Sequence, residues 1–407
     1  MNVKIDSAFI SPDRLLFELV ERKGLGHPDT LADGLAENAE IEYCKYCLRE
    51  FGCIPHHNFD KLTLTGGMCK QVWGGGRFTE PVRLTFLGRG SKIFAGKSIP
   101  LAEIQESSAR EYLSRILPAL NISDPQQFFC ESLTSSRSTR HNWFTPESIN
   151  DLPEYSQGGP YSNDTAAMIS WYPLTECESL ALHIEGWFYT EKDGLPRPKF
   201  QEFGQDIKIM IARKDKRISA TVAVPFMTQK FHSVDEYRER LEILRMELAE
   251  HISSSYPESN IVLHVNWNAA LGDMRVYLTT GGSCTDFGEE GAVGRGNKTH
   301  GIISSFRPNT MEAPHGKNSV YFAGKILGYL ADVTAKEIYT ETGKPCQIIL
   351  QADMGAKLYE PSNVIISAEG KIDRSIIDGI ISRNFLPGHE VTNRILASRH
   401  FIPRISI

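Results

Sequence analysis

The chain has 407 residues, of which 41% are hydrophobic and 23% are charged, and its formal net charge is −6. This length is too great for one small core and predicts two or three domains, while the composition is ordinary for a soluble globular protein. The acidic balance excludes a chain built to bind nucleic acid or acidic membranes, so any anion site must be a local basic cluster.

The N-terminal stretch MNVKIDSAFISPDRLLFELVERKG lacks the basic start, apolar run and small-residue cleavage site of a secretory signal. No run of about 18 apolar residues occurs, so we predict no membrane span. The eight cysteines are scattered along the chain. Without an export signal they are expected to be reduced thiols, which places the protein in the cytoplasm.

Hydrophobic periodicity alternates between strand-like and helix-like along the chain. The predicted elements, in order, are a strand or short helix at 14–22, a helix at 30–51, strands at 62–73 and 81–87, a helix at 101–116, two strands within 206–226, a helix at 234–253, strands at 261–266 and 275–280, a helix at 317–339, and strands at 346–352 and 363–368. Residues 132–162 are rich in turn-forming residues and predict a long loop or boundary. This mixture predicts an α+β fold with antiparallel or mixed sheets.

A glycine-rich turn, GLGHPDT at 24–30, precedes the first long helix. The N-terminus of a helix favours anions, because its first backbone N–H groups are free to donate. His27 could donate to a phosphate oxygen, and Asp29 could hold Mg²⁺, which prefers carboxylate, water and phosphate ligands. Such turns are common, so the pattern alone favours a helix capped by Asp29 or Thr30, with a surface histidine.

A second glycine-rich segment, GEEGAVGRGNK at 288–298, continues to Arg307 and Lys317. Its acidic residues precede arginine and lysine placed between glycines, a mixture that suits a polyphosphate together with its metal ion. The segment is not a Walker P-loop, because GxxxxGK[ST] does not occur. The alternative is a mobile, solvated loop.

The segment GQDIKIM at 204–210 carries two opposite charges at alternate positions. A strand here would point Asp206 and Lys208 to the same face of its sheet. Two such charges more often form a surface ion pair than part of a site. The pattern by itself therefore favours the ion pair.

Cys44 and Cys47 lie near Cys53, His56 and His57, which raises the possibility of a zinc site. The two cysteines of the CxxC pair fall on a predicted helix, and no second CxxC pair exists. The pattern therefore favours buried free thiols on one helix face.

These segments, in this order, resemble the archaeal-type S-adenosylmethionine synthetases (methionine adenosyltransferases). The matching segments are ERKGLGHPDTLADGLAE at 21–37, HHNFDK at 56–61, GGGRFTEP at 74–81, NDTAAMISWYPLTECE at 163–178, GQDIKIMIAR at 204–213, VAVPFMTQKFHSVDEY at 222–237 and GEEGAVGRGNKTHGIISSFRPNTMEAPHGKNSVYFAGKI at 288–326. Together they run over most of the chain, and the last segment by itself is specific for the family.

The resemblance implies three similar α/β domains around a pseudo-threefold axis. Approximate and interleaved boundaries would be 1–130, 131–270 and 271–407. It also implies a homodimer with active sites between the subunits, Mg²⁺ and a potassium ion as cofactors, and ATP with methionine or a related thioether as substrates. The expected reaction is attack of sulfur on C5′ of ATP, followed by hydrolysis of the released triphosphate to phosphate and pyrophosphate.

By matching position, the resemblance also assigns roles to single residues. His27 would aid departure of the polyphosphate, and Asp29 and Glu289 would hold the metal ion. The cations on the triphosphate would be Lys208, Arg295 and Lys317. The remaining expected residues of the ATP or substrate site are Asp60, Lys61, Asn163, Asp164, Thr165, Asp206 and Lys298.

The chain departs from the family where the sulfur substrate is expected. Ser170-Trp171-Tyr172 stands where the family commonly has Gly-Tyr-Ala, and Lys70 stands near an expected carboxylate that could receive methionine's ammonium. Two alternatives to methionine adenosylation therefore stay open. One is a paralogue that adenosylates another nucleophile or uses ATP differently, and the other is a non-catalytic, nucleotide-binding regulatory subunit.

Overall fold

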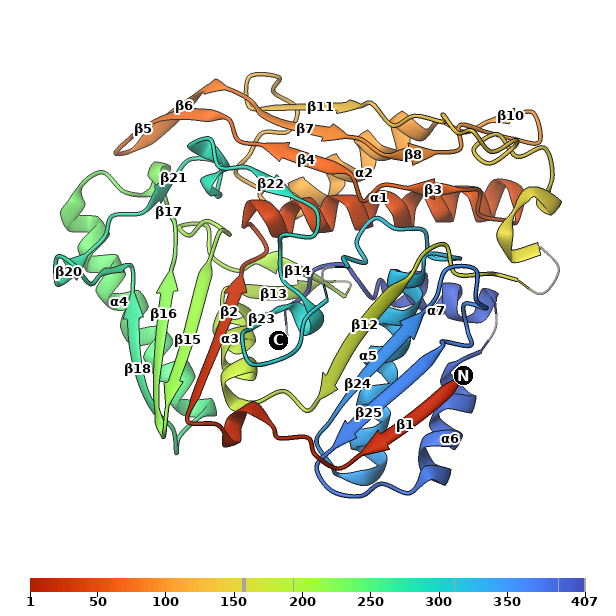
Figure 1. Cartoon of the computed structure of the whole chain (residues 1–407). Coiled ribbons are helices and arrows are strands. Elements are labelled where there is room, and N and C mark those ends of the chain that lie inside the picture. Colours follow the sequence, from red (N-terminus) through yellow and green to blue (C-terminus); the bar gives the residue numbers. More distant parts are fainter. Residues whose placement is uncertain (156–158, 193, 311, 387, 406–407) are drawn as a thin grey trace.

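The computed structural model describes residues 1–155, 159–192, 194–310, 312–386 and 388–405. Three large sheets, each packed against helices, make up most of this part of the chain (Figure 1). The sheets contain antiparallel and parallel strand pairs, which confirms the predicted α+β class. No helix among the described residues is long and apolar enough to cross a membrane. The domain boundaries and the pseudo-threefold axis stay predictions.

The first sheet has the order β11-β7-β4-β22, with only β11 and β7 parallel. Its strands are β4 (Leu62–Thr65), β7 (Val82–Phe86), β11 (Phe128–Ser132) and β22 (Gly291–Ala292). The helices packed on it are α1 (Pro28–Phe51) and α2 (Leu101–Ile116). Strand β22 brings the second glycine-rich segment against α1.

The second sheet has the order β18-β16-β15-β2-β23. Its strands are β2 (Phe17–Lys23), β15 (Lys208–Lys214), β16 (Arg217–Ala223), β18 (Asn260–Val265) and β23 (Ile303–Ser304). Helix α3 (Glu176–Gly186) packs on β2 and β15, and α4 (Val234–Ser255) packs on β18. This sheet places the end of β2, and so the first glycine-rich turn, beside the start of β15.

The third sheet has the order β1-β25-β24-β12 and joins the two ends of the chain. Its strands are β1 (Asn2–Asp6), β12 (Ala166–Tyr172), β24 (Cys346–Ala352) and β25 (Asn363–Ala368). Helix α5 (Ala323–Thr342) packs on β12 and β24, and α6 (Arg374–Asn384) and α7 (His389–Ser398) pack on α5.

Shorter strands form two-stranded pairs outside these sheets. They are β3 (His57–Asn58) with β8 (Arg89–Gly90), β5 (Met68–Val72) with β6 (Gly75–Glu80), β9 (Ile93–Phe94) with β10 (Lys97–Ser98), β13 (Tyr189–Lys192) with β14 (Leu195–Pro198), β17 (Phe226–Met227) with β21 (Leu278–Thr279), and β19 (Trp267–Asn268) with β20 (Asp273–Met274). The predicted strand at 62–73 is therefore two strands of different sheets. Gly66 and Gly67 separate them, and a Cβ at Gly67 would lie 2.4 Å from the Glu80 carbonyl oxygen.

Helix α1 runs beneath the first sheet and is buried along most of its length (Figure 1). It ends at Gly52 with φ 71°, the left-handed conformation predicted for that glycine. The predicted cap, Asp29 or Thr30, is wrong. The N-cap is His27, whose ring accepts a hydrogen bond from the Asp29 N–H. Pro28 takes the first helical position, for which its fixed φ is suited, so Asp29 and Thr30 fall inside the first turn.

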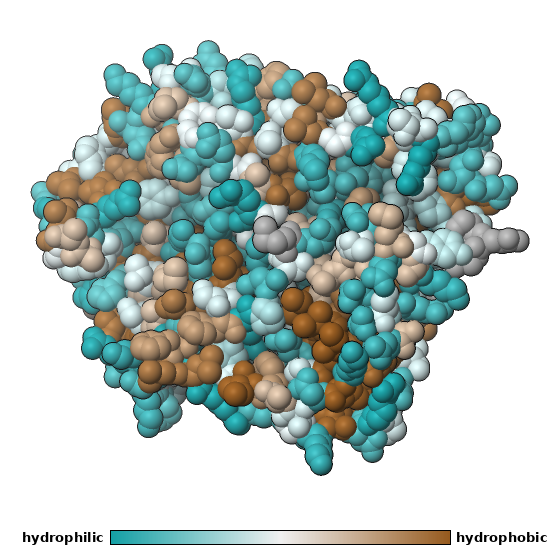
Figure 2. All heavy atoms as spheres, viewed as in Figure 1, coloured by the Kyte–Doolittle hydropathy of each residue, from teal (hydrophilic) through white to brown (hydrophobic). Residues whose placement is uncertain are grey.

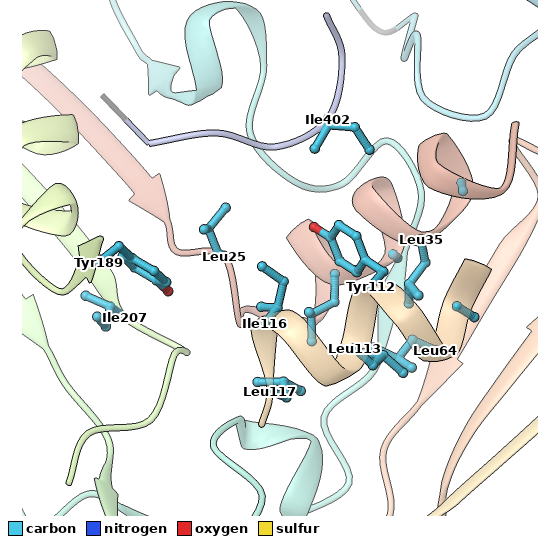
Figure 3. Close-up of a cluster of buried hydrophobic side chains, with 14 of the residues drawn as sticks. Leu25, Leu35, Leu64, Tyr112, Leu113, Ile116, Leu117, Tyr189, Ile207 and Ile402 are labelled. Carbon is cyan, nitrogen blue, oxygen red and sulfur yellow. The ribbon is translucent and has the colours of Figure 1, made fainter. Parts of the chain in front are cut away.

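The apolar core joins α1 and α2 to β4 and reaches the C-terminal segment (Figure 3). Leu35, Leu113 and Ile116 are almost fully buried there, and Ile402 from beyond α7 packs into the same cluster. A second apolar cluster lies around α5, β24 and β25. The segment that follows α7 therefore lies between the three sheets, where Arg22 donates to the Arg404 carbonyl.

A buried ion pair fixes the end of β2. Arg22 Nε lies 2.5 Å from Glu185 Oε2 on α3, and both side chains are fully buried. Replacing Arg22 with methionine is expected to lower the free energy of unfolding by about 3–5 kcal/mol, because Glu185 would keep a buried charge without its partner. Urea unfolding followed by circular dichroism measures the change.

Two controls isolate the charge effect. Adding Glu185→Gln to Arg22→Met should recover much of the loss, since glutamine can still accept from the Leu25 N–H without a charge. Arg14→Met, which removes an exposed ion pair with Glu369, should change stability by about 1 kcal/mol or less. A double variant no more stable than the single one would contradict the argument.

Candidate active site

The first glycine-rich turn presses against the segment before β15. The Gly24 N–H donates to the Ile207 carbonyl at 2.7 Å, and the Gly26 N–H donates to the Gln205 carbonyl at 2.9 Å. A Cβ at Gly24 would lie 2.4 Å from the Ile207 carbonyl oxygen. Only glycine permits this approach, so the two glycines bring His27 next to the segment that carries Asp206 and Lys208.

His27 is oriented for donation to a ligand. Its Nδ1 accepts from the Asp29 N–H at 3.2 Å, so the neutral ring carries its proton on Nε2. Among the described residues, Nε2 has no hydrogen-bond partner. Burial lowers the pKa of His27, and Asp206 and Asp29 oppose that effect. The neutral ring is therefore favoured near pH 7, with one free N–H.

Asp29 is buried and ties the two glycine-rich segments together. Its Oδ2 lies 2.9 Å from Lys23 Nζ, and its Oδ1 accepts from the Ala292 N–H at 3.2 Å. Lys23 Nζ also donates to the Arg295 carbonyl at 2.7 Å. Lys23 was not among the predicted site residues, although it stands in the matching segment immediately before Gly24.

Asp206 and Lys208 do not form the surface ion pair that their pattern favours. Asp206 is buried and accepts from the Tyr277 hydroxyl at 2.9 Å and the Cys284 N–H at 3.1 Å. Lys208 is exposed and pairs with Glu21 at 3.2 Å. Asp206 and Lys208 do not share a strand face, because β15 begins only at Lys208, after the chain has passed the glycine-rich turn.

The second glycine-rich segment is anchored to α1, unlike the solvated loop that composition allowed. Asp33 Oδ1 accepts from the Gly294 N–H at 2.8 Å, and a Cβ at Gly291 would lie 2.0 Å from the Pro28 carbonyl oxygen. Lys298 Nζ donates to the Gly294 carbonyl at 2.6 Å. The side chains of Glu289 and Arg295 remain exposed beside this anchored backbone.

A second group of predicted residues lines a cavity of about 340 Å³ near the start of α5. The predicted residues that line it are Asp60, Lys61, Asn163, Asp164 and Lys317. Thr165 lies just outside, where its N–H donates to Asp164 Oδ1 at 2.8 Å. Asn163 Oδ1 accepts from the Ala323 N–H at 2.9 Å, so it helps fix the first turn of α5.

Lys317 is the buried cation of this cavity. It is 6% exposed, and its ammonium pairs with Glu312, a residue that the sequence did not single out. Burial lowers the pKa of Lys317 to about 8, and Asp60 acts in the opposite direction. Lys317 therefore carries most of its charge at neutral pH, at a site where water screens it little.

Helix α5 begins at Ala323, six residues later than the predicted start at 317. The Gly316 N–H donates to Glu37 and the Ser319 N–H to Glu40, both on α1. These buried carboxylates accept the backbone N–H groups of Gly316 and Ser319 and hold the segment out of the helix. The predicted start of α5 is therefore wrong because contacts with α1 hold the segment that carries Lys317.

The predicted residues thus form two clusters. One surrounds His27 and Asp29 at the start of α1, and the other surrounds Lys317, whose segment is held by Glu37 further along that helix. The nine-residue step from Pro28 to Glu37 spans roughly 14 Å of helix. In the part of the chain described, no hydrogen bond or ion pair joins the predicted residues of one cluster to those of the other.

The first cluster offers oxygen donors of the kind that Mg²⁺ prefers. Glu289 is exposed and has no ion-pair partner among the described residues. Asp29 shares its charge with Lys23 at 2.9 Å. The donor set fits a magnesium ion bound together with phosphate oxygens, with Glu289 the more available carboxylate.

The unusual Ser170-Trp171-Tyr172 run lies away from the second cluster. Trp171 is fully buried, and the Arg307 guanidinium lies 5.1 Å from its ring centroid. The Ser170 hydroxyl donates to Asp332 at 3.2 Å. Asp332 lines a second cavity of about 480 Å³ under the C-terminal segment, which also includes Lys298 and shares Glu312 with the first. The bulky side chains of this run therefore pack around the end of β12 and do not enter the cavity beside Asp164.

His56, from the HHN segment, makes stability depend on pH. It is fully buried, stacks on Trp143 with 3.7 Å between ring centroids, and contacts the Tyr321 hydroxyl at 3.0 Å. Burial lowers its pKa from 6.5 to about 4. The unfolded chain therefore binds a proton near pH 6 that the native chain rejects, and stability falls as the pH drops.

Between pH 7 and pH 5 this histidine is expected to remove roughly 2 kcal/mol from the free energy of unfolding. Urea unfolding at both pH values measures it. His56→Phe keeps an aromatic ring against Trp143 and should flatten the difference, whereas His141→Phe, at an exposed position two residues before Trp143, should not. Equal pH dependence in all three proteins would refute the assignment.

Known proteins match this chain across its length. The family model described as S-adenosylmethionine synthetase (AdoMet synthetase) matches residues 2–396. S-adenosylmethionine synthase of Archaeoglobus fulgidus is 32% identical over 405 residues, covering 98% of this chain and 96% of that protein. The Methanoregula boonei enzyme of the same name is 33% identical over 338 residues, covering 83% and 81%.

An uncharacterized protein of Streptococcus pyogenes serotype M1 is 50% identical over 408 residues, covering 100% of this chain and 99% of its own. The archaeal similarity and the family match extend over the segments that carry both clusters. The chain therefore belongs to the S-adenosylmethionine synthetase family, as a divergent member.

Proposed function

We propose that this protein makes S-adenosylmethionine from ATP and L-methionine. The observation that carries the proposal is the Nε2–H of His27, which has no partner among the described residues. A turn that only glycines permit holds it beside Asp29, Asp206 and Lys208. Family membership supports the same reaction class.

The residue types fit the charges that this reaction creates. A neutral thioether sulfur needs no base, but its attack on C5′ leaves a sulfonium and releases a triphosphate. His27, Lys208 and Arg295 would hold the oxygens of that leaving group, with cations fixed in place before reaction. Glu289 and Asp29 would hold Mg²⁺, which neutralises phosphate charge when bound. The same cations would serve hydrolysis of the bound triphosphate to phosphate and pyrophosphate.

We propose further that two copies of the chain complete each site. In the second sheet, Leu19, Glu21 and Lys23 share one face of β2 with Met210 and Lys208 of β15. Leu19 and Met210 are 41% and 38% exposed, and apolar side chains gather over these strands in Figure 2. An exposed apolar sheet face marks an interaction surface.

Covering this face with a second copy would bury Lys208 and Lys23 at the interface. It would also let the Lys317 cluster of one copy meet the His27 cluster of the other, which a single chain keeps roughly 14 Å apart along α1. The expected assembly is a homodimer with two shared sites. Light scattering that shows only monomers under assay conditions would contradict this part of the proposal.

The experiment that tests the reaction is mass spectrometry of the products from ATP, Mg²⁺ and methionine, with a panel of other thioethers beside it. S-adenosylmethionine, phosphate and pyrophosphate are expected in equal amounts, and only when methionine is present. Product from another thioether alone would support the paralogue that the Lys70 position suggests. Nucleotide binding without turnover in any mixture would leave the regulatory subunit as the explanation.

A further inference from the structure

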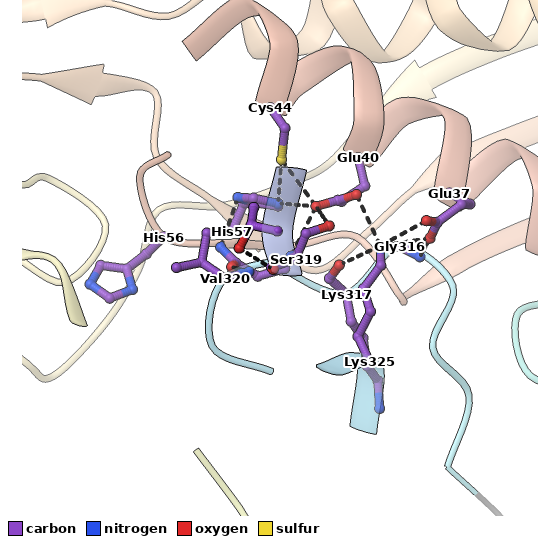
Figure 4. A network of polar contacts seen from close by, with 12 residues as sticks. Glu37, Glu40, Cys44, His56, His57, Gly316, Lys317, Ser319, Val320 and Lys325 are labelled. Atoms are coloured by element: carbon purple, nitrogen blue, oxygen red, sulfur yellow. Dashed lines mark hydrogen bonds and ion pairs between the residues drawn. The ribbon is translucent and has the colours of Figure 1, made fainter. Parts of the chain in front are cut away.

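A sulfur, a nitrogen and an oxygen donor meet in the interior beside α1, outside both clusters of the candidate site (Figure 4). Glu40 and Cys44 are one turn apart on α1, and His57 faces them from β3. All three side chains are fully buried. Cys44 and His57 belong to the cysteines and histidines whose spacing raised the possibility of a zinc site, whereas Glu40 was not among them.

The three donor atoms lie at or slightly below the separations of metal ligands. Cys44 Sγ is 3.0 Å from Glu40 Oε1 and 3.7 Å from His57 Nε2, and Nε2 is 3.2 Å from Oε1. Ligands at about 2.0–2.3 Å from a tetrahedral zinc ion lie roughly 3.3–3.7 Å from one another. One ion could therefore contact all three atoms after shifts of a few tenths of an ångström.

The surroundings of His57 allow it to be a metal ligand. Nδ1 lies 2.9 Å from the Pro55 carbonyl oxygen and 3.1 Å from Asn318 Nδ2, so it can either donate or accept. In the tautomer with the proton on Nδ1, the lone pair of Nε2 faces Glu40 Oε1 at 3.2 Å and is available to a cation. A histidine whose other nitrogen donates to a backbone carbonyl is the common form of a metal ligand.

Glu40 Oε1 is surrounded by more donors than an oxygen with two lone pairs can accept well. Besides Cys44 and His57, the Ser319 hydroxyl lies 2.8 Å and the Ser319 N–H 3.1 Å from it. The other oxygen, Oε2, takes the Lys325 ammonium at 2.9 Å. A metal ion would replace two of the four hydrogens on Oε1, and the Lys325 contact would remain.

We propose that Cys44, His57 and Glu40 bind one zinc ion, with the Ser319 hydroxyl beside the fourth position. Binding releases the thiol proton of Cys44 and takes His57 in the tautomer with its proton on Nδ1, so Zn²⁺ replaces one proton and the net charge of the cluster rises by one. Thiolate and imidazole ligands select zinc over Mg²⁺, which prefers oxygen alone. The site is therefore separate from the proposed magnesium site.

The zinc ion would be structural. It would join α1 to β3 and, through Ser319, to the segment that carries Lys317. Because the ligands are fully buried, the ion has to enter during folding rather than by exchange in the native state. An experiment must therefore supply the metal during expression.

The test uses the untagged, full-length protein expressed in defined medium with zinc or with cobalt. After dialysis against a chelator, elemental analysis should find one zinc ion per chain. The cobalt form should show sulfur-to-cobalt charge-transfer absorption together with tetrahedral d–d bands. Cys44→Ser should lose both signals. Cys47→Ser is the matched control, because Cys47 is equally buried on α1 but lies outside the donor group, and it should retain both.

The cobalt spectrum of the wild-type protein needs no variant, so it decides the question even if Cys44→Ser fails to fold. Wild-type protein with no bound metal, or with cobalt that lacks the charge-transfer band, would overturn the proposal. Equal metal content in the Cys44 and Cys47 variants would also overturn it. Neither result depends on whether the protein makes S-adenosylmethionine.

Discussion

Replacing Lys317 with alanine is expected to lower kcat for S-adenosylmethionine formation by about 10²- to 10³-fold, the usual cost of removing one fixed group that stabilises transition-state charge. Lys317 is 6% exposed and would meet the leaving triphosphate where water screens its charge little. The KM for methionine should change far less, because the lost contact is to phosphate. Initial rates at saturating ATP, with methionine varied, separate the two constants.

The pH profile gives an independent measure of the same residue. With a pKa of about 8 in the free enzyme, Lys317 loses its proton above that pH. The wild-type kcat/KM for ATP is therefore expected to fall as the pH rises past 8. Lys336→Ala, an exposed position on α5, is the control and should leave both the rates and the profile unchanged. An unchanged kcat in Lys317→Ala would remove this lysine from the catalytic group.

Replacing His27 with asparagine is expected to lower kcat by about 10²- to 10³-fold with little loss of stability. Asparagine is a good N-cap, so it can accept the Asp29 N–H that Nδ1 now accepts. It cannot place an N–H donor where Nε2 of the imidazole reaches. The variant therefore separates the capping role of His27 from its proposed role on the leaving group.

His27→Ala provides the contrast. Its kcat should fall by the same factor, and its free energy of unfolding should fall by about 1 kcal/mol because the helix loses its cap. Rates from phosphate release and stabilities from urea unfolding would be measured on both variants. If asparagine restored full activity, the capping of α1 would be the whole function of His27, and the proposed contact with the polyphosphate would be wrong.

The sequence was most informative where one segment carries its own pattern. The long periodic stretches predicted α1, α2 and α4, and β24 and β25 have the predicted bounds. Prediction was poorer where distant segments control the backbone. The start of α5 depends on Glu37 and Glu40 of α1, and no local pattern around residue 317 reports them.

The candidate site shows the same division. The matching segments identified the residue types of both clusters in advance, together with the family to which the chain belongs. They could not show that Asp206 is buried while Lys208 is exposed, because that depends on where β15 starts. Nor could they show Lys23 against Asp29 or Glu312 against Lys317, since both pairs depend on how the backbone turns between the two residues.

The sequence alone determined the family, the class of fold and the set of charged residues, because these follow from residue types in a fixed order. Only the tertiary structure decided which of those residues meet. It separated His27 from Lys317 along α1 and brought Cys44, His57 and Glu40 together. The physical reason is that buried charges must find partners, and the partners here lie up to hundreds of residues away in the chain.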